Sequence, residues 1–145
     1  MNYLTKLEEL EQELYDKGIQ VLEEPITPNI DAVAIKCDNR YGIFLNAALE
    51  LDSSKKEYLL CHELAHIETS SFYNFNNYKR TRKSKEMKAI KEHLRHYPEI
   101  TPEQLKKHLE NGLQVWDLAE IFNCDEDLIK DAIYYYTHKV WKVWF

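Results

Sequence analysis

The chain has 145 residues, which is room for one domain with a single hydrophobic core. Hydrophobic residues make up 44% and charged residues 30%, and no apolar run approaches the roughly 18 residues that cross a bilayer. The net charge of −6 argues against general binding to nucleic acid or to anionic membranes. We therefore expect a single domain over residues 1–145 without a membrane span.

The cysteines and the first residues indicate the compartment. Cys37, Cys61 and Cys124 are far apart and form no CxxC pair, which indicates neither a disulfide framework nor a thiolate zinc site. Residues 1–18 are acidic and periodic, and they lack the basic start, apolar core and cleavage site of a secretory signal. We therefore predict a cytoplasmic protein.

The N-terminal half combines one helix with short strands. Leucines recur at helical spacing before a glycine, which predicts an amphipathic helix over residues 3–17. Residues 19–22, 31–37 and 41–45 are short, apolar or alternating, as in strands. Turn residues at 38–40 favour a hairpin between the second and third strands. These patterns predict a small sheet of about three strands, antiparallel or mixed.

The remaining sequence is mainly helical. Ser54 and Glu57 have the spacing of a capping box, so we expect a helix to begin there and to continue through residue 68. Residues 74–77 read as a loop. Further helices are predicted over residues 84–96, 102–110, 115–122 and 125–136, with residues 113–145 as a helical extension of the same domain. The fold class is therefore α+β, with the sheet packed on the helix that follows it.

Residues 62–66 read HELAH in the middle of a predicted helix. Residues four apart lie on one helical face, so the imidazoles of His62 and His66 can share one metal ion. Glu63 projects beside them, where it can act as a general base toward a metal-bound water. A purely structural role explains the two histidines less readily than metal binding does, because the helix needs an apolar face for packing. The pattern predicts a Zn²⁺ site with Glu63 as the catalytic residue of a peptidase.

Catalytic zinc commonly has a third protein ligand. Glu68 follows the second histidine too closely and points off the metal face. Glu86 is better placed, in the first turn of the next predicted helix, although the helix dipole alone also favours a carboxylate there. Glu92 is the next carboxylate in that helix, and His93 or His96 would supply an imidazole instead. The residues by themselves leave these alternatives open.

Several segments resemble the ImmA/IrrE family of zinc metallopeptidases, which share a gluzincin-like HExxH motif. They are YGIFLN at 41–46, the HELAH helix, ETSSFY at 68–73, Glu86-x-x-Ala89 and the block DLAEIFNCDEDLIKDAIYYY at 117–136. The resemblance covers most of residues 18–136. By position it implies His62, His66 and Glu86 as zinc ligands and Glu63 as the general base.

The resemblance also implies a substrate class. Members of the family that are understood cleave helix-turn-helix transcriptional repressors of mobile elements, such as phages, or of stress regulons, inside the cytoplasm. It does not single out the residue that stabilises the oxyanion, for which Tyr73, Tyr78, His93 and His96 remain candidates. His93 has a slight advantage, because it lies seven residues after Glu86 and therefore on the same helical face.

Two other functions are weighed against the peptidase. Residues 117–136 imitate a DNA-binding helix pair, but residues 113–136 hold six acidic residues and one lysine, the wrong sign beside phosphates. The basic segment at 79–107 could touch phosphate instead, although most such runs are solvated faces. A zinc-binding but catalytically idle regulatory protein would not require Glu63, which is not itself needed as a ligand.

Two further expectations concern contacts. The aromatic tail at residues 137–145 either docks on its own domain or contacts a partner chain. Residues 41–46 are the candidate sheet edge for an extended substrate, because they shortly precede the metal helix and Gly42 would permit close approach of another backbone.

Overall fold

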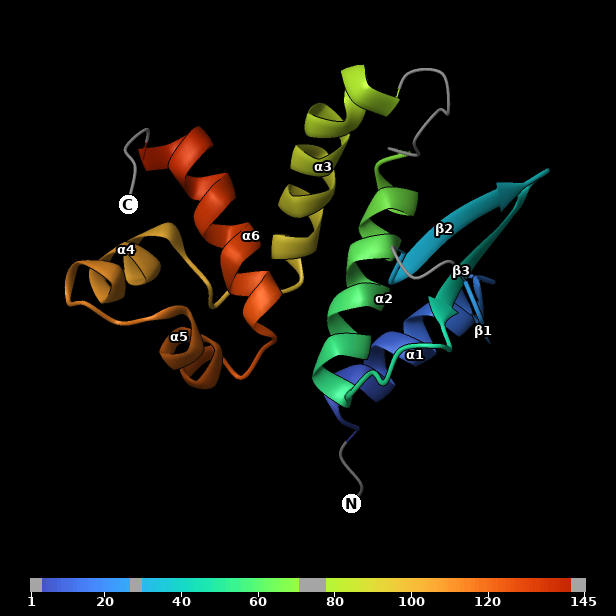
Figure 1. Cartoon of the computed structure of the whole chain (residues 1–145), viewed down its shortest axis with the longest axis horizontal. Coiled ribbons are helices and arrows are strands. Elements are labelled where there is room, and N and C mark those ends of the chain that lie inside the picture. The colour runs from blue at the N-terminus through green and yellow to red at the C-terminus, as the bar shows by residue number, and fades with distance from the viewer. Residues whose placement is uncertain (1–3, 27–29, 71–77, 142–145) are drawn as a thin grey trace.

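Figure 1 shows the computed structural model, which describes residues 4–26, 30–70 and 78–141, with side chains after the second gap described from residue 86 on. A three-stranded sheet lies on one side of the long helix α2 (Ser53–Glu68), and helix α3 (Tyr78–Arg95) lies on the other. The fold is α+β with a helical C-terminal half, as predicted. Within the described residues, no helix is both long enough and apolar enough to cross a membrane.

The sheet is mixed, in the order β1-β3-β2. Strand β1 (Gln20–Glu24) pairs parallel with β3 (Arg40–Asn46), and β3 pairs antiparallel with β2 (Ala32–Cys37) in the predicted hairpin. Because β3 is the central strand, both of its edges are occupied. The expectation that residues 41–46 form an open edge is therefore wrong. The edge strand that contacts α2 is β2.

Helix α2 begins differently from the sequence prediction. Asp52, not Ser54, is the N-cap residue, and its carboxylate accepts a hydrogen bond of 2.8 Å from the Lys55 amide. Glu57 accepts a 2.8 Å hydrogen bond from the Tyr97 hydroxyl and so does not close the expected capping box. The cap differs because the competing tertiary hydrogen bond cannot be read from local spacing.

Helix α3 begins at Tyr78, earlier than the predicted residue 84, and the predicted loop at 74–77 lies outside the described residues. Glu86 is consequently in the third turn of α3 and not in its first turn. A preference of carboxylates for helix N-termini therefore does not account for Glu86.

The C-terminal helices follow the predicted caps. They are α4 (Pro102–Glu110), α5 (Val115–Phe122) and α6 (Glu126–Tyr136), followed by a short π-helical turn at Thr137–Trp141. Thr101 caps α4, which begins with the proline, and Gly112 follows that helix with φ of 81°. Trp141 packs against Tyr136 of the core, which is the docked alternative for this part of the tail.

Buried side chains from both ends of the chain form one hydrophobic cluster. Helix α1 (Lys6–Asp16) contributes Leu14, the sheet contributes Ile43, α2 contributes Leu64 and α6 contributes Ile129, and all four are fully buried. Helix α2 therefore lies between the sheet and the helical half, and its orientation is set by packing on both sides.

Candidate metal centre

The candidate centre begins with helix α2. Leu60 and Leu64 are buried in the core, which orients the helix, and His62 and His66 lie one turn apart on a different face. Both imidazoles are largely removed from solvent, since the side chains of His62 and His66 are 13% and 5% exposed. The helix thus presents two buried imidazoles to its neighbours.

Helix α3 brings the carboxylate of Glu86 to both histidines. The His62 Nε2 to Glu86 Oε2 distance is 3.3 Å, and the His66 Nε2 to Glu86 Oε1 distance is 3.2 Å. A tetrahedral site with bonds of about 2.0–2.1 Å has donor-to-donor edges of about 3.3 Å. The two nitrogens and the carboxylate therefore have the spacing that a tetrahedral His2Glu metal site requires. The structure brings together the three residues that the resemblance implied.

The charges in this group are strongly coupled. Burial opposes the charged form of Glu86, but hydrogen bonds from His62 and His66 and their charges outweigh it and lower the pKa of Glu86 to about 2. Burial also opposes a charge on His62, yet the hydrogen bond and charge of Glu86 raise its pKa above the ordinary value. Glu86 is therefore an ionised carboxylate facing two imidazoles, which is the state required of a metal ligand.

Glu63 has a different environment from these three residues. Its carboxylate accepts a backbone hydrogen bond from Ala34 of strand β2 and therefore lies between the histidines and the sheet edge. Burial raises the pKa of Glu63, and the adjacent imidazoles oppose this rise only in part. A carboxylate whose pKa is shifted toward neutrality exchanges protons more readily at physiological pH, as a general base must.

The other candidates lie elsewhere. Glu68, Glu92 and His96 form a separate group on α2 and the end of α3, where His96 Nε2 lies 3.3 Å from Glu68. His93 is fully buried, and burial holds its pKa well below the usual range, so it is a neutral group inside the protein. This burial makes His93 a poor candidate for contact with an oxyanion. The side chains of Tyr73 and Tyr78 lie outside the described residues.

Two residues behind the centre were not singled out by their chemistry in the sequence. Tyr58 of α2 donates a hydrogen bond to Asp131 of α6, and the Tyr58 ring stacks on His62 with centroids 5.7 Å apart. Asp131 lies three residues after the buried Leu128 and next to Ala132. The presence of Asp131 within the apolar stripe of this helix was the signal in the sequence that could have indicated a buried, functional carboxylate.

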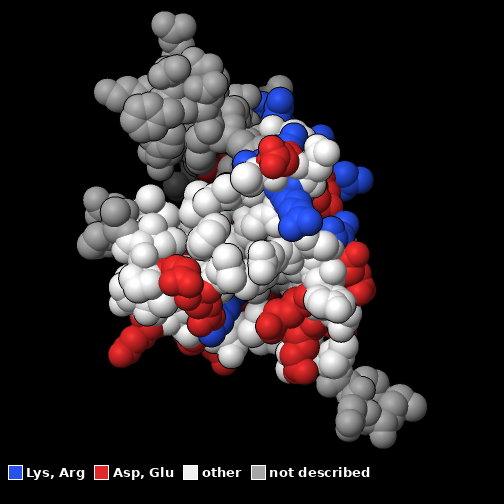
Figure 2. All heavy atoms as spheres, turned by 90° about the vertical axis from the view of Figure 1, so that its right-hand side faces the viewer, with Lys and Arg blue, Asp and Glu red and all other residues white. Residues whose placement is uncertain are grey.

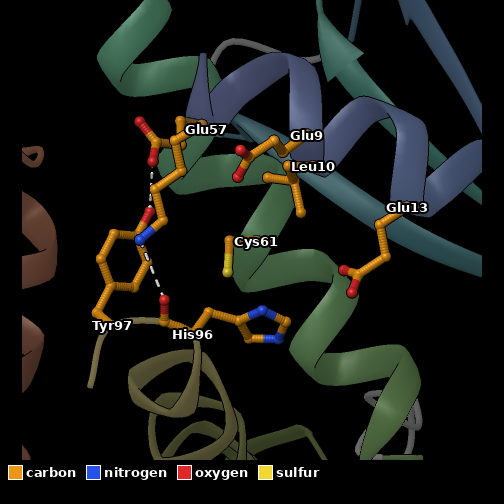
Figure 3. A pocket seen from close by; sticks show the side chains of 8 residues that line it. Glu9, Leu10, Glu13, Glu57, Cys61, His96 and Tyr97 are labelled. Carbon is orange, nitrogen blue, oxygen red and sulfur yellow. Dashed lines mark hydrogen bonds between the residues drawn. The ribbon is translucent and has the colours of Figure 1, made fainter. Parts of the chain in front are cut away.

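A separate cavity of about 250 Å³ lies between α1, α2 and the end of α3 (Figure 3). It is lined by Glu9 and Glu13 of α1 and by Cys61 and His96. Lys6 brings a positive charge into this cavity, lies 3.6 Å from the centre of the Tyr97 ring and donates a hydrogen bond to the His96 carbonyl. Neither histidine of the HELAH motif lines this cavity, so it is separate from the candidate metal centre.

Comparisons with protein-family models, with curated proteins and with solved structures found no match for this chain. The function proposed below therefore rests on the geometry of the site and on the motifs of the sequence.

Proposed function

We propose that the chain is a zinc-dependent endopeptidase. The observation that carries this proposal is the convergence of His62, His66 and Glu86 at 3.2–3.3 Å, with Glu63 held beside them at the sheet edge. A purely structural metal site would gain nothing from a second, separately held carboxylate. Its presence favours hydrolysis over structural metal binding.

His62, His66 and Glu86 would hold the zinc ion through two nitrogens and one carboxylate. When bound, zinc would supply a Lewis acid that lowers the pKa of water toward about 7 and polarises a carbonyl oxygen. Glu63 would accept the proton of the attacking water and deliver it to the leaving amine. The hydrogen bond from Ala34 would keep the Glu63 carboxylate in position while it accepts the proton from water and then delivers it to the amine.

An extended substrate would lie along the open edge of β2. Asn46 donates a 2.9 Å backbone hydrogen bond to Asp31, so alternation along the ladder turns the amides of Ala32 and Lys36 away from β3, on the same side as the Ala34 amide that binds Glu63. Figure 2 views the side of the molecule on which Figure 1 shows the sheet, and the centre of this face carries neither acidic nor basic side chains. Such an edge suits recognition of a peptide backbone.

The resemblance to the ImmA/IrrE family supports the choice of substrate. We propose a cytoplasmic enzyme that cleaves a helix-turn-helix repressor of a mobile element or of a stress regulon. The α5–α6 pair would then act as structure and not as a DNA reader. In support, α6 buries Leu128 and Ile129 and turns Asp131 toward Tyr58 of α2.

The decisive experiment separates zinc binding from catalysis. Glu63→Gln has nearly the same shape as the parent side chain but cannot accept the proton, so it should retain one zinc per chain and lose cleavage by several orders of magnitude. His62→Ala and His66→Ala should lose the zinc itself. Zinc content is measured by elemental analysis, and cleavage is measured on purified helix-turn-helix repressors.

A matched control is Glu57→Gln. Glu57 lies on the same helix but on the cavity side, where it binds Tyr97. This variant should retain both zinc and cleavage. Near-parental cleavage by Glu63→Gln would contradict the assigned base, and full zinc occupancy in both histidine variants would contradict the metal centre.

A further inference from the structure

The region behind His62 contains buried nitrogens without hydrogen-bond partners. Both ring nitrogens of His93 are buried, and neither has a hydrogen-bond partner among the described residues. The Nδ1 atom of His62 is likewise buried without a partner. The two rings lie 5.9 Å apart between centroids. Buried polar atoms in native proteins almost always have a partner, so this arrangement calls for a function.

Asp131 brings a carboxylate to the same place. Ligand atoms of His62, His93 and Asp131 all lie within 4.8 Å of one another, a spacing that one bridging water molecule spans. Tyr58 donates a hydrogen bond to one carboxylate oxygen of Asp131, and its ring lies 5.3 Å from that of His93. Three helices, α2, α3 and α6, therefore meet at this group.

The chemistry of a metal ligand explains why such a group is needed. A neutral imidazole carries one N–H, so a histidine that binds a metal through Nε2 must keep its proton on Nδ1. The Nε2 atom of His62 faces Glu86, which leaves Nδ1 toward the interior. A buried N–H at that atom needs an acceptor, and the acceptors nearby are Asp131 and a ring nitrogen of His93.

We propose that His93 and Asp131 are positioning residues that accept the hydrogen bond of the His62 Nδ1–H group within a buried network and so hold Nε2 toward the metal. This inference rests on the proposed metal centre. Tyr58 orients Asp131 within the network. Outer groups of this kind typically contribute 10-fold to 100-fold to metal affinity.

The test compares the zinc affinity of variants that change His93 or Asp131 with that of a control variant at a neighbouring residue. His93→Leu has a similar volume without ring nitrogens, and Asp131→Ala removes the carboxylate. Each should weaken zinc binding 10-fold to 100-fold in competition with a chelator. His93→Gln, which keeps a polar group, should restore most of this affinity. The matched control is Tyr97→Phe, whose ring also lies next to His93 but whose hydroxyl binds Glu57, so its removal should leave zinc affinity unchanged.

Nitrogen NMR of the zinc-loaded protein provides a second measurement that packing alone would not affect. In the parent, His62 should show a slowly exchanging proton on Nδ1, and this signal should weaken in Asp131→Ala. If a variant fails to fold without metal, the test rests on the parent protein alone. The absence of a slowly exchanging His62 Nδ1 proton in the zinc-loaded parent would then overturn the proposal.

Other results separate this inference from the proposed function. Folded His93→Leu and Asp131→Ala proteins that bind zinc as tightly as Tyr97→Phe overturn the positioning role and leave the metal centre intact. A second zinc equivalent that disappears in Asp131→Ala overturns it as well, because the group would then be a metal site. Unchanged zinc affinity in His62→Ala overturns the metal centre and this inference together.

Discussion

Helices α2 and α3 bring together two groups of side chains with three ligand atoms each. The inner cluster is His62, His66 and Glu86, and the outer cluster is Glu68, Glu92 and His96. In the inner cluster one carboxylate faces both imidazoles at 3.2 and 3.3 Å. In the outer cluster the imidazole lies 3.3 Å from Glu68, while Glu92 pairs with Arg95 at 3.1 Å.

The difference shows that residue types alone do not define a metal site. In the outer cluster one carboxylate already pairs with an arginine, and the side chain of His96 is 24% exposed to solvent. In the inner cluster the imidazoles are buried on a helix held by the core, so their geometry costs little to maintain. We therefore expect metal binding at the inner cluster, and the following predictions test this contrast.

The largest effect is expected when the two carboxylates of α3 are removed one at a time. Glu86→Ala removes the oxygen ligand that faces both imidazoles, and zinc binding should be lost at micromolar metal. Glu92→Ala should retain one zinc per chain. Elemental analysis after dialysis distinguishes the two variants, and zinc loss in Glu92→Ala alone would reverse the assignment.

The next effect concerns the core that supports the inner cluster. Leu64 lies between the two histidines in sequence and is fully buried, so Leu64→Ala should lower the free energy of unfolding by about 2–5 kcal/mol. Urea unfolding of the metal-free protein provides the measurement. Ile121→Ala, at a side chain that is 53% exposed, is the control and should change stability by less than about 1 kcal/mol.

A smaller effect is expected at the sheet edge. Lys36→Pro removes an amide that points away from β3, so it should reduce cleavage about threefold to tenfold and leave zinc content unchanged. Lys36→Ala keeps the amide and serves as the control for the side chain. Equal cleavage rates in these two variants would place the substrate away from this amide.

The smallest effect is expected in the outer cluster. Glu68→Gln removes one charge of a partly exposed pair with His96, so stability should change by less than about 1 kcal/mol and zinc content should not change. Thermal unfolding and elemental analysis measure both quantities. A loss of zinc in this variant would show that the outer cluster contributes to metal binding.

Local signals in the sequence predicted a substantial part of the fold. Thr101 before Pro102 and the glycine at 112 marked both ends of α4, because caps and turns depend on neighbouring residues. The order of the strands was not predictable in this way. Strand β1 pairs directly with β3 although β2 lies between them in the sequence, and no local pattern specifies that pairing.

The sequence by itself determined that His62, Glu63 and His66 lie within one turn of a helix, because the helical repeat depends only on local geometry. Only the tertiary structure decided that Glu86 and not Glu92 faces the histidines, and that Asp131 lies behind them. Those relations depend on how α2, α3 and α6 pack, which is set by buried side chains distributed over the whole chain.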